Sequence, residues 1–134
     1  MGLFAFLFGP RTPTAAAPRP VPIDALEEVK DRILAACESR SDWGEHTKAK
    51  IAAKAKEVFF MTLAARDLLR ASSLGRDDIA NIGILLERMT VAESDLASAL
   101  DTLDADARDL RRALEKAFQP CNAAIRQRLG RQDG

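Results

Sequence analysis

The chain has 134 residues, in which twenty lysines and arginines balance twenty aspartates and glutamates, and 47% of the residues are hydrophobic. This length predicts one domain, and this composition excludes both a disordered chain and a strongly charged one. One histidine, two cysteines and no tyrosine exclude most histidine-rich metal sites, a framework of several disulfides and an aromatic platform for nucleic-acid bases. We therefore expect no enzyme, no cofactor, no metal and no nucleic-acid partner.

Residues 1–9 form a charge-free apolar segment that stops at Pro10. A signal peptide has a basic start and a longer apolar run, and a membrane span needs about 20 apolar residues. The segment is therefore predicted neither to be cleaved nor to cross a bilayer. It suits three roles: an anchor in a membrane interface, a peptide that fills a partner's groove, or a segment that packs on its own bundle. The residues assigned to the binding role are Leu3, Phe4, Phe6, Leu7 and Phe8.

The first nine residues, MGLFAFLFG, resemble the leaders of small bacterial cytoplasmic proteins that associate peripherally with membranes. Some companions of toxic-anion-resistance proteins are among them. The resemblance implies attachment to a membrane surface without a spanning helix.

Residues 10–22 are predicted to be a disordered linker. Five of these thirteen residues are proline, and two arginines stand without an acid. Proline fixes φ and removes amide donors, so an extended tether of at most roughly 40 Å is expected at about 3.1 Å per residue. A PxxP match at Pro10 to Pro13 is explained by this spacer composition.

Residues 23–130 are predicted to form an all-α bundle, followed by a flexible tail at 131–134. A first helix over about 24–40 is expected to begin at Asp24 with a capping box completed by Glu27. A second helix is expected to begin at Asp42 in the same way and to end before Gly75, which would take a left-handed conformation.

The longest pattern runs from Ile79 to Cys121, with apolar residues at alternating spacings of three and four. Gly83 is its one glycine, and no proline interrupts it before Pro120, so one coiled-coil-like helix of about forty residues is the leading prediction. This gives an antiparallel hairpin or three-helix bundle. The alternative is a break between Asp101 and Asp106, where aspartates favour a helix cap, and that break gives a compact four-helix bundle.

Charge supports an antiparallel pairing of the second and third segments. Residues 45–75 carry six basic and three acidic groups, whereas residues 76–110 carry three basic and nine acidic groups. Folding about Gly75 is expected to place Glu93 near Lys54 and Lys56.

A continuous third helix would extend beyond its antiparallel neighbour and leave an apolar stripe uncovered. We therefore expect a homo-oligomer, unless the chain folds back after Pro120 and covers the stripe. The residues assigned to this interface are Ala107, Leu110, Leu114 and Ala117.

The remaining chemistry-bearing residues have simple structural explanations. His46 is expected to face solvent on a helix, and Cys37 and Cys121 are expected to be buried, reduced and far apart. The leading hypothesis is a cytoplasmic, non-enzymatic helical scaffold or adaptor, held peripherally at the inner membrane face by its N-terminal segment. The alternative is a cargo or structural component of a shell, capsid or secretion machinery, docked through the same segment.

Overall fold

The computed structural model describes residues 20–71 and 73–133, with side chains described for 20–71 and 73–130. This part of the chain forms four helices: α1 (Ile23–Ser39), α2 (Glu45–Leu69), α3 (Arg76–Asp101) and α4 (Ala105–Asp133). The apolar segment predicted at 1–9, and residues 10–19 of the predicted linker, lie outside the described residues.

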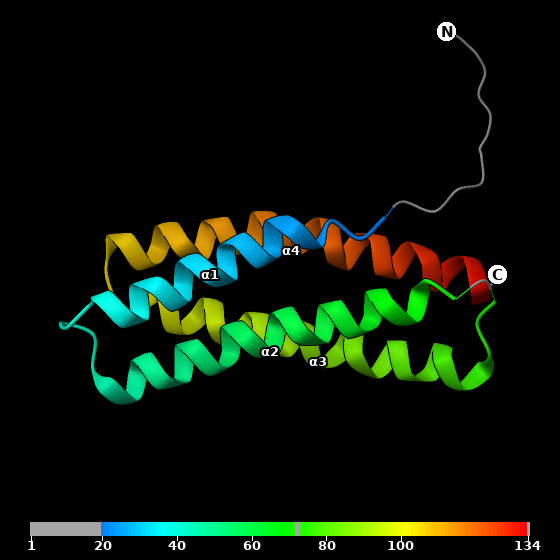
Figure 1. Ribbon diagram of the computed structural model, residues 1–134, viewed down its shortest axis with the longest axis horizontal. Helices are drawn as coiled ribbons and strands as arrows, with labels where there is room; N and C mark the ends of the chain where they lie inside the picture. The colour runs from blue at the N-terminus through cyan, green and yellow to red at the C-terminus, as the bar shows by residue number, and fades with distance from the viewer. Residues whose placement is uncertain (1–19, 72, 134) are drawn as a thin grey trace, which may run out of the picture.

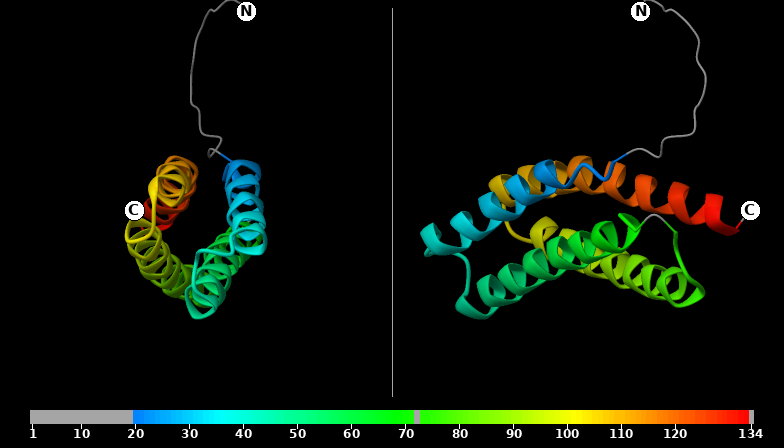
Figure 2. Two further views of the ribbon diagram at one scale, coloured as in Figure 1. Left: turned by 90° about the vertical axis from the view of Figure 1, so that its left-hand side faces the viewer. Right: turned by 45° about the vertical axis from the view of Figure 1, so that its right-hand side comes forward.

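The helices form an up-down-up-down bundle, as Figure 1 shows. Consecutive helices pack side by side, and α4 also packs against α1, which closes the ring. In the end-on view of Figure 2, α1 and α4 form one side of the ring, and α2 and α3 form the other. The compact four-helix bundle is therefore the observed fold.

The prediction of one continuous helix after Gly75 is wrong, because Thr102 to Asp104 separate α3 from α4. The Asp104 carboxylate accepts the backbone N–H of Ala107 at 2.9 Å, which caps the first turn of α4. The apolar spacing continues through this turn because both helices face the same core. The capping chemistry of the aspartates, and not the spacing, marks the break.

Three other predicted helix ends are also corrected. Pro22 and not Asp24 precedes α1, and Gly44 and not Asp42 precedes α2, in both cases without a side-chain cap. Gly75 lies directly before α3 with φ of −76°, so it is not left-handed. Its N–H donates to the Asp78 carboxylate at 3.3 Å, which helps to fix the start of α3.

One hydrophobic core runs through the bundle and draws on all four helices. Its largest side chains with almost no exposure include Leu26 and Ile33 of α1, Ile51 and Val58 of α2, Met89 and Leu96 of α3, and Phe118 and Ile125 of α4. Thr62 is buried among them, and its hydroxyl donates to the carbonyl of Val58 at 2.7 Å. Among the residues whose side chains the structure describes, this core extends from Ile23 to Ile125.

Pro120 does not end α4, which continues to Asp133. A proline inside a helix has no N–H to donate to the carbonyl four residues earlier, here that of Lys116. Beyond it, Cys121 and Ile125 remain fully buried, so apolar packing holds the last turns on the bundle.

Candidate functional site

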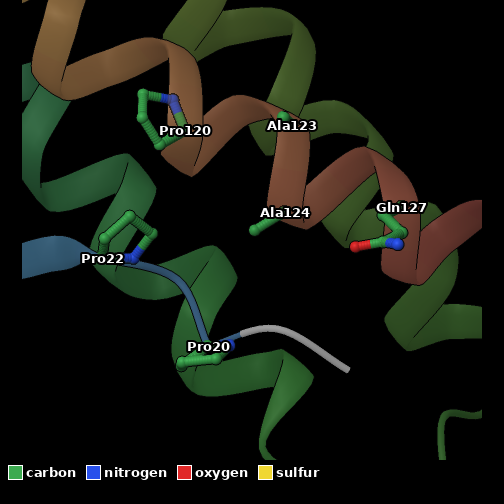
Figure 3. A pocket seen from close by; sticks show the side chains of 6 residues that line it. All are labelled: Pro20, Pro22, Pro120, Ala123, Ala124 and Gln127. Atoms are coloured by element: carbon green, nitrogen blue, oxygen red, sulfur yellow. The ribbon is translucent and has the colours of Figure 1, made fainter. Parts of the chain in front are cut away.

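A groove lies where the chain enters the bundle, between the residues before α1 and the second half of α4. Its volume is about 560 Å³, and Figure 3 shows the side chains that line it. The lining carries no charged side chain and consists of Pro20, Pro22, Pro120, Ala123, Ala124 and Gln127. Pro20, the first residue that the structure describes, thus lies at this groove.

Three contacts hold the entering chain at this groove. Val21 is partly buried against the core, and its carbonyl accepts the N–H of Ile23 at 2.8 Å. The Cys121 thiol lies 3.4 Å from the carbonyl oxygen of Pro22. Within the described residues, packing against the core thus already includes Val21, two residues before the predicted start of the bundle at residue 23.

The end of the bundle that holds the α1–α2 and α3–α4 connections (Figure 1) is closed by a charged network around Arg40. Its guanidinium donates to Asp42 at 2.9 and 2.7 Å, to Asp106 at 3.1 Å and to Asp104. The buried Trp43 indole donates to Asp104 at 2.9 Å, and the Arg40 guanidinium lies 4.9 Å from the centre of its ring. The network thus joins the α1–α2 connection to the α3–α4 connection.

Hydrogen bonds lower the pKa values of two carboxyl groups in this network. The Trp43 indole and the Ala107 N–H lower the pKa of Asp104, and the Arg40 guanidinium adds to that effect. The Arg40 hydrogen bond also lowers the pKa of Asp42. Both carboxylates are therefore ionised at neutral pH, and the network stabilises the fold.

Glu93 has a different neighbourhood from the predicted one. Burial and the nearby Glu115 raise its pKa, and Arg111 opposes this effect. Lys54, its predicted partner, lies 3.7 Å from Asp95 instead. The predicted antiparallel pairing of α2 and α3 is observed, and Asp95, two residues after Glu93, takes the partner predicted for Glu93. The prediction did not include α4, which folds back after Asp101 and brings Glu115 and Arg111 close to Glu93.

The two thiols lie at different levels of the bundle. Burial raises the pKa of Cys37, and it raises that of Cys121 to about 11. Cys121 contacts Pro22 before the start of α1, and Cys37 lies near its end. Fifteen residues of helix separate these levels by roughly 20 Å at 1.5 Å per residue, which exceeds the reach of a disulfide.

His46 is exposed in the first turn of α2, as predicted. Within residues 20–71 and 73–133, no group of three or more histidine, cysteine, aspartate or glutamate side chains is arranged to hold a metal ion.

The structure corrects the predicted oligomer interface. The side chains of Ala107, Leu110, Leu114 and Ala117 are only 0%, 7%, 2% and 6% exposed in the single chain. The helix break removes the unpaired extension on which the prediction depended and turns these residues into the core. The large hydrophobic side chains that are exposed in the described part of the chain lie elsewhere, on α2 and α3: Phe60, Ile84 and Val91.

None of the helices in the described residues is both long enough and apolar enough to span a bilayer. Comparison with known proteins adds no relative, because no family model, no curated protein and no solved structure matches this chain.

Proposed function

We propose that this protein is a non-enzymatic helical adaptor that attaches to the cytoplasmic face of a membrane through Leu3, Phe4, Phe6, Leu7 and Phe8. The proposal rests on a difference between two parts of the chain, the apolar N-terminal segment and the helical bundle. The apolar segment and its proline-rich linker precede a bundle whose described residues form one hydrophobic core with side chains from all four helices. We propose that the five large apolar side chains of the segment serve binding.

The groove at Pro20 supports this interpretation. It is lined mainly by prolines and alanines. Such small and rigid side chains offer less contact area than the large apolar residues that form the core around Phe118 and Ile125. The groove therefore offers the phenylalanine side chains less apolar contact than a lipid interface does.

The expected attachment is weak and reversible. Full burial of a large apolar side chain contributes about 1.5–3 kcal/mol, so four such side chains give a gross gain of several kcal/mol. The loss of translational freedom and the ordering of the segment offset much of this gain. A protein attached in this way exchanges between the membrane surface and solution.

The test is flotation of the full-length chain with lipid vesicles, beside the double variant Phe4→Asp with Phe8→Asp. Wild-type protein is expected to float with the vesicles and the variant to remain in the dense fraction. A matched control, Phe60→Asp with Val91→Asp, changes two exposed apolar residues of the bundle and should still float. If wild-type protein floats with vesicles of no composition, membrane attachment is rejected, and the alternative of docking on a protein assembly is favoured.

A further inference from the structure

The exposed large hydrophobic side chains of the bundle are concentrated on α3. In the described part of the chain, α1 and α4 expose none, whereas α3 exposes Ile84 at 52% and Val91 at 58%. These two residues are seven positions apart, so they lie on one line along the outer side of α3. Phe60 of α2 is 55% exposed but stands apart, because the Lys30 ammonium group of α1 lies 5.8 Å from the centre of its ring. An exposed apolar line is typical of a surface that packs against another molecule.

Two unlike charges flank this apolar line. Glu87 and Arg88 are both exposed, and they follow Ile84 by three and four positions. Three positions along an α-helix turn a side chain by about 60° to one side, and four positions turn it by about 40° to the other. Among the described side chains, neither Glu87 nor Arg88 forms an ion pair, whereas Glu57 of α2 is paired with Lys54 at 3.2 Å. The apolar line therefore has an unpaired acid on one side and an unpaired base on the other.

The contacts of α3 with its neighbours agree with these two sides. Asp95, seven residues after Arg88, pairs with a lysine of α2 at 3.7 Å, so Arg88 lies on the side of α3 that is nearer α2. Thr90, three residues after Glu87, is hydrogen-bonded to an asparagine of α4 at 3.2 Å, so Glu87 lies between the apolar line and the α4 contact. Both charged side chains border a groove of about 300 Å³ beside Val91. The charges and the apolar line thus form one surface.

We propose that this surface of α3 binds a second copy of the chain and forms a parallel, two-fold dimer. Charge complementarity identifies the occupant. When two identical helices run in the same direction about a two-fold axis, each side of one helix faces the opposite side of the other. Glu87 of each copy then faces Arg88 of the second copy, and Ile84 and Val91 meet their own counterparts at the axis.

The same charges disfavour the antiparallel arrangement. An antiparallel two-fold pair brings equal sides together, which places Glu87 beside Glu87 and Arg88 beside Arg88, and like charges at such short range repel. The dimer does not depend on the proposed membrane attachment, because all the residues that form it lie on α3.

The experiment is sedimentation equilibrium of the full-length chain without lipid. One helix of each copy makes the contact, so wild-type protein is expected to show a weak monomer–dimer equilibrium at concentrations up to about 500 μM. Val91→Asp places a charge at the axis and should weaken the dimer by about tenfold or more. Its matched control, Phe60→Asp, changes a side chain of similar exposure on α2 and should leave the dimer unchanged. Circular dichroism checks that every variant folds.

A second pair of variants tests the two charges. Arg88→Glu gives both sides of the apolar line an acid and should weaken the dimer by about tenfold. Glu87→Arg with Arg88→Glu exchanges the two charges and restores their complementarity in a parallel pair, so its affinity should return to within about threefold of wild type. An antiparallel pair would keep its like-charge contacts after the exchange.

Four results would contradict the inference. Wild-type protein that stays monomeric over the whole concentration range would overturn the dimer but leave membrane attachment intact. Equal losses in Val91→Asp and Phe60→Asp would overturn the assignment to α3, and failure of the exchanged charges to restore affinity would overturn the parallel pairing. If Phe4→Asp with Phe8→Asp abolishes association, the contact belongs to the N-terminal segment and not to α3.

Discussion

The Arg40 end of the bundle and the place where the chain enters it at Pro20 (Figure 1) are constructed differently. At the Arg40 end, one cation, three aspartates and a buried tryptophan connect two interhelical turns through hydrogen bonds. At the Pro20 entry, the groove is lined mainly by prolines and alanines and by no charged side chain among the described residues. Paired charges around a buried ring stabilise a fold, whereas a groove of small apolar side chains adds little to it. We therefore assign stability to the Arg40 end, and the proposed attachment would act from the chain that precedes Pro20.

The largest effect on stability is expected from charges placed in the hydrophobic core of the bundle. In Leu110→Glu with Leu114→Glu, two carboxylates replace buried leucines, and each costs several kcal/mol when it lacks a partner. Against a typical total stability of about 5–15 kcal/mol, the variant should be unfolded by circular dichroism.

The control, Gln119→Glu with Ala123→Glu, places the same two charges one turn apart at exposed positions of α4 and should remain folded. A well-folded Leu110→Glu, Leu114→Glu monomer, obtained from an oligomeric wild type, would contradict the intramolecular packing.

The second-largest effect is the loss of stability when the buried tryptophan at the Arg40 end is removed, compared with the loss when an exposed aromatic residue is removed. Trp43→Ala removes a side chain that is 2% exposed and is expected to lower the free energy of unfolding in urea by about 3–5 kcal/mol. Phe60→Ala also removes an aromatic ring, but one that is 55% exposed, and should cost less than about 1 kcal/mol. Similar losses for the two variants would mean that the network end does not depend on its tryptophan.

Most of the helical architecture could be predicted from sequence, but the closure of the Arg40 end could not. Apolar spacing identified the helical segments and marked Ala107 and Leu114 as members of an apolar stripe, but it assigned them to an oligomer interface, whereas they belong to the core of the single chain. It could not locate the break, because a four-helix bundle and a continuous coiled coil require the same spacing. The clustered aspartates did signal the break, and they were correctly noted as the alternative.

Contacts between distant residues were the main failure of the sequence interpretation. Asp42 was assigned to a helix cap because capping is a local pattern, yet its carboxylate binds Arg40. The Trp43 indole reaches Asp104, sixty-one residues away, and local patterns carry no information about such a pair. The groove at Pro20 was missed for the same reason.

A smaller, pH-dependent effect is expected from Asp104. Its pKa in the folded state lies below the ordinary 3.8, so its ionised form contributes stability that is present above about pH 4 and is lost as the pH falls through the lowered value. Asp104→Asn keeps a residue that can cap α4 but removes the charge. Its melting temperature should be lower than that of wild type at pH 7, and the gap should close below that pKa. A gap that persists unchanged in acid would contradict the electrostatic explanation.

Glu93 should respond to pH in the opposite direction. Its folded-state pKa is raised above 4.5, so ionisation disfavours the folded state at neutral pH, and this penalty is relieved as the pH falls to about 4.5. Glu93→Gln is therefore expected to melt at a slightly higher temperature than wild type at pH 7 and at the same temperature near pH 4. A lower melting temperature at pH 7 would show that Arg111 outweighs burial.

The most direct test of the account is the thermal unfolding of Phe4→Asp with Phe8→Asp beside wild type, in the absence of lipid. If the apolar segment serves attachment and the bundle is complete without it, the two proteins should melt at the same temperature, and only the wild type should bind vesicles. If the variant melts at a clearly lower temperature, the phenylalanines belong to the core of the bundle, and the assignment of attachment to this segment is wrong.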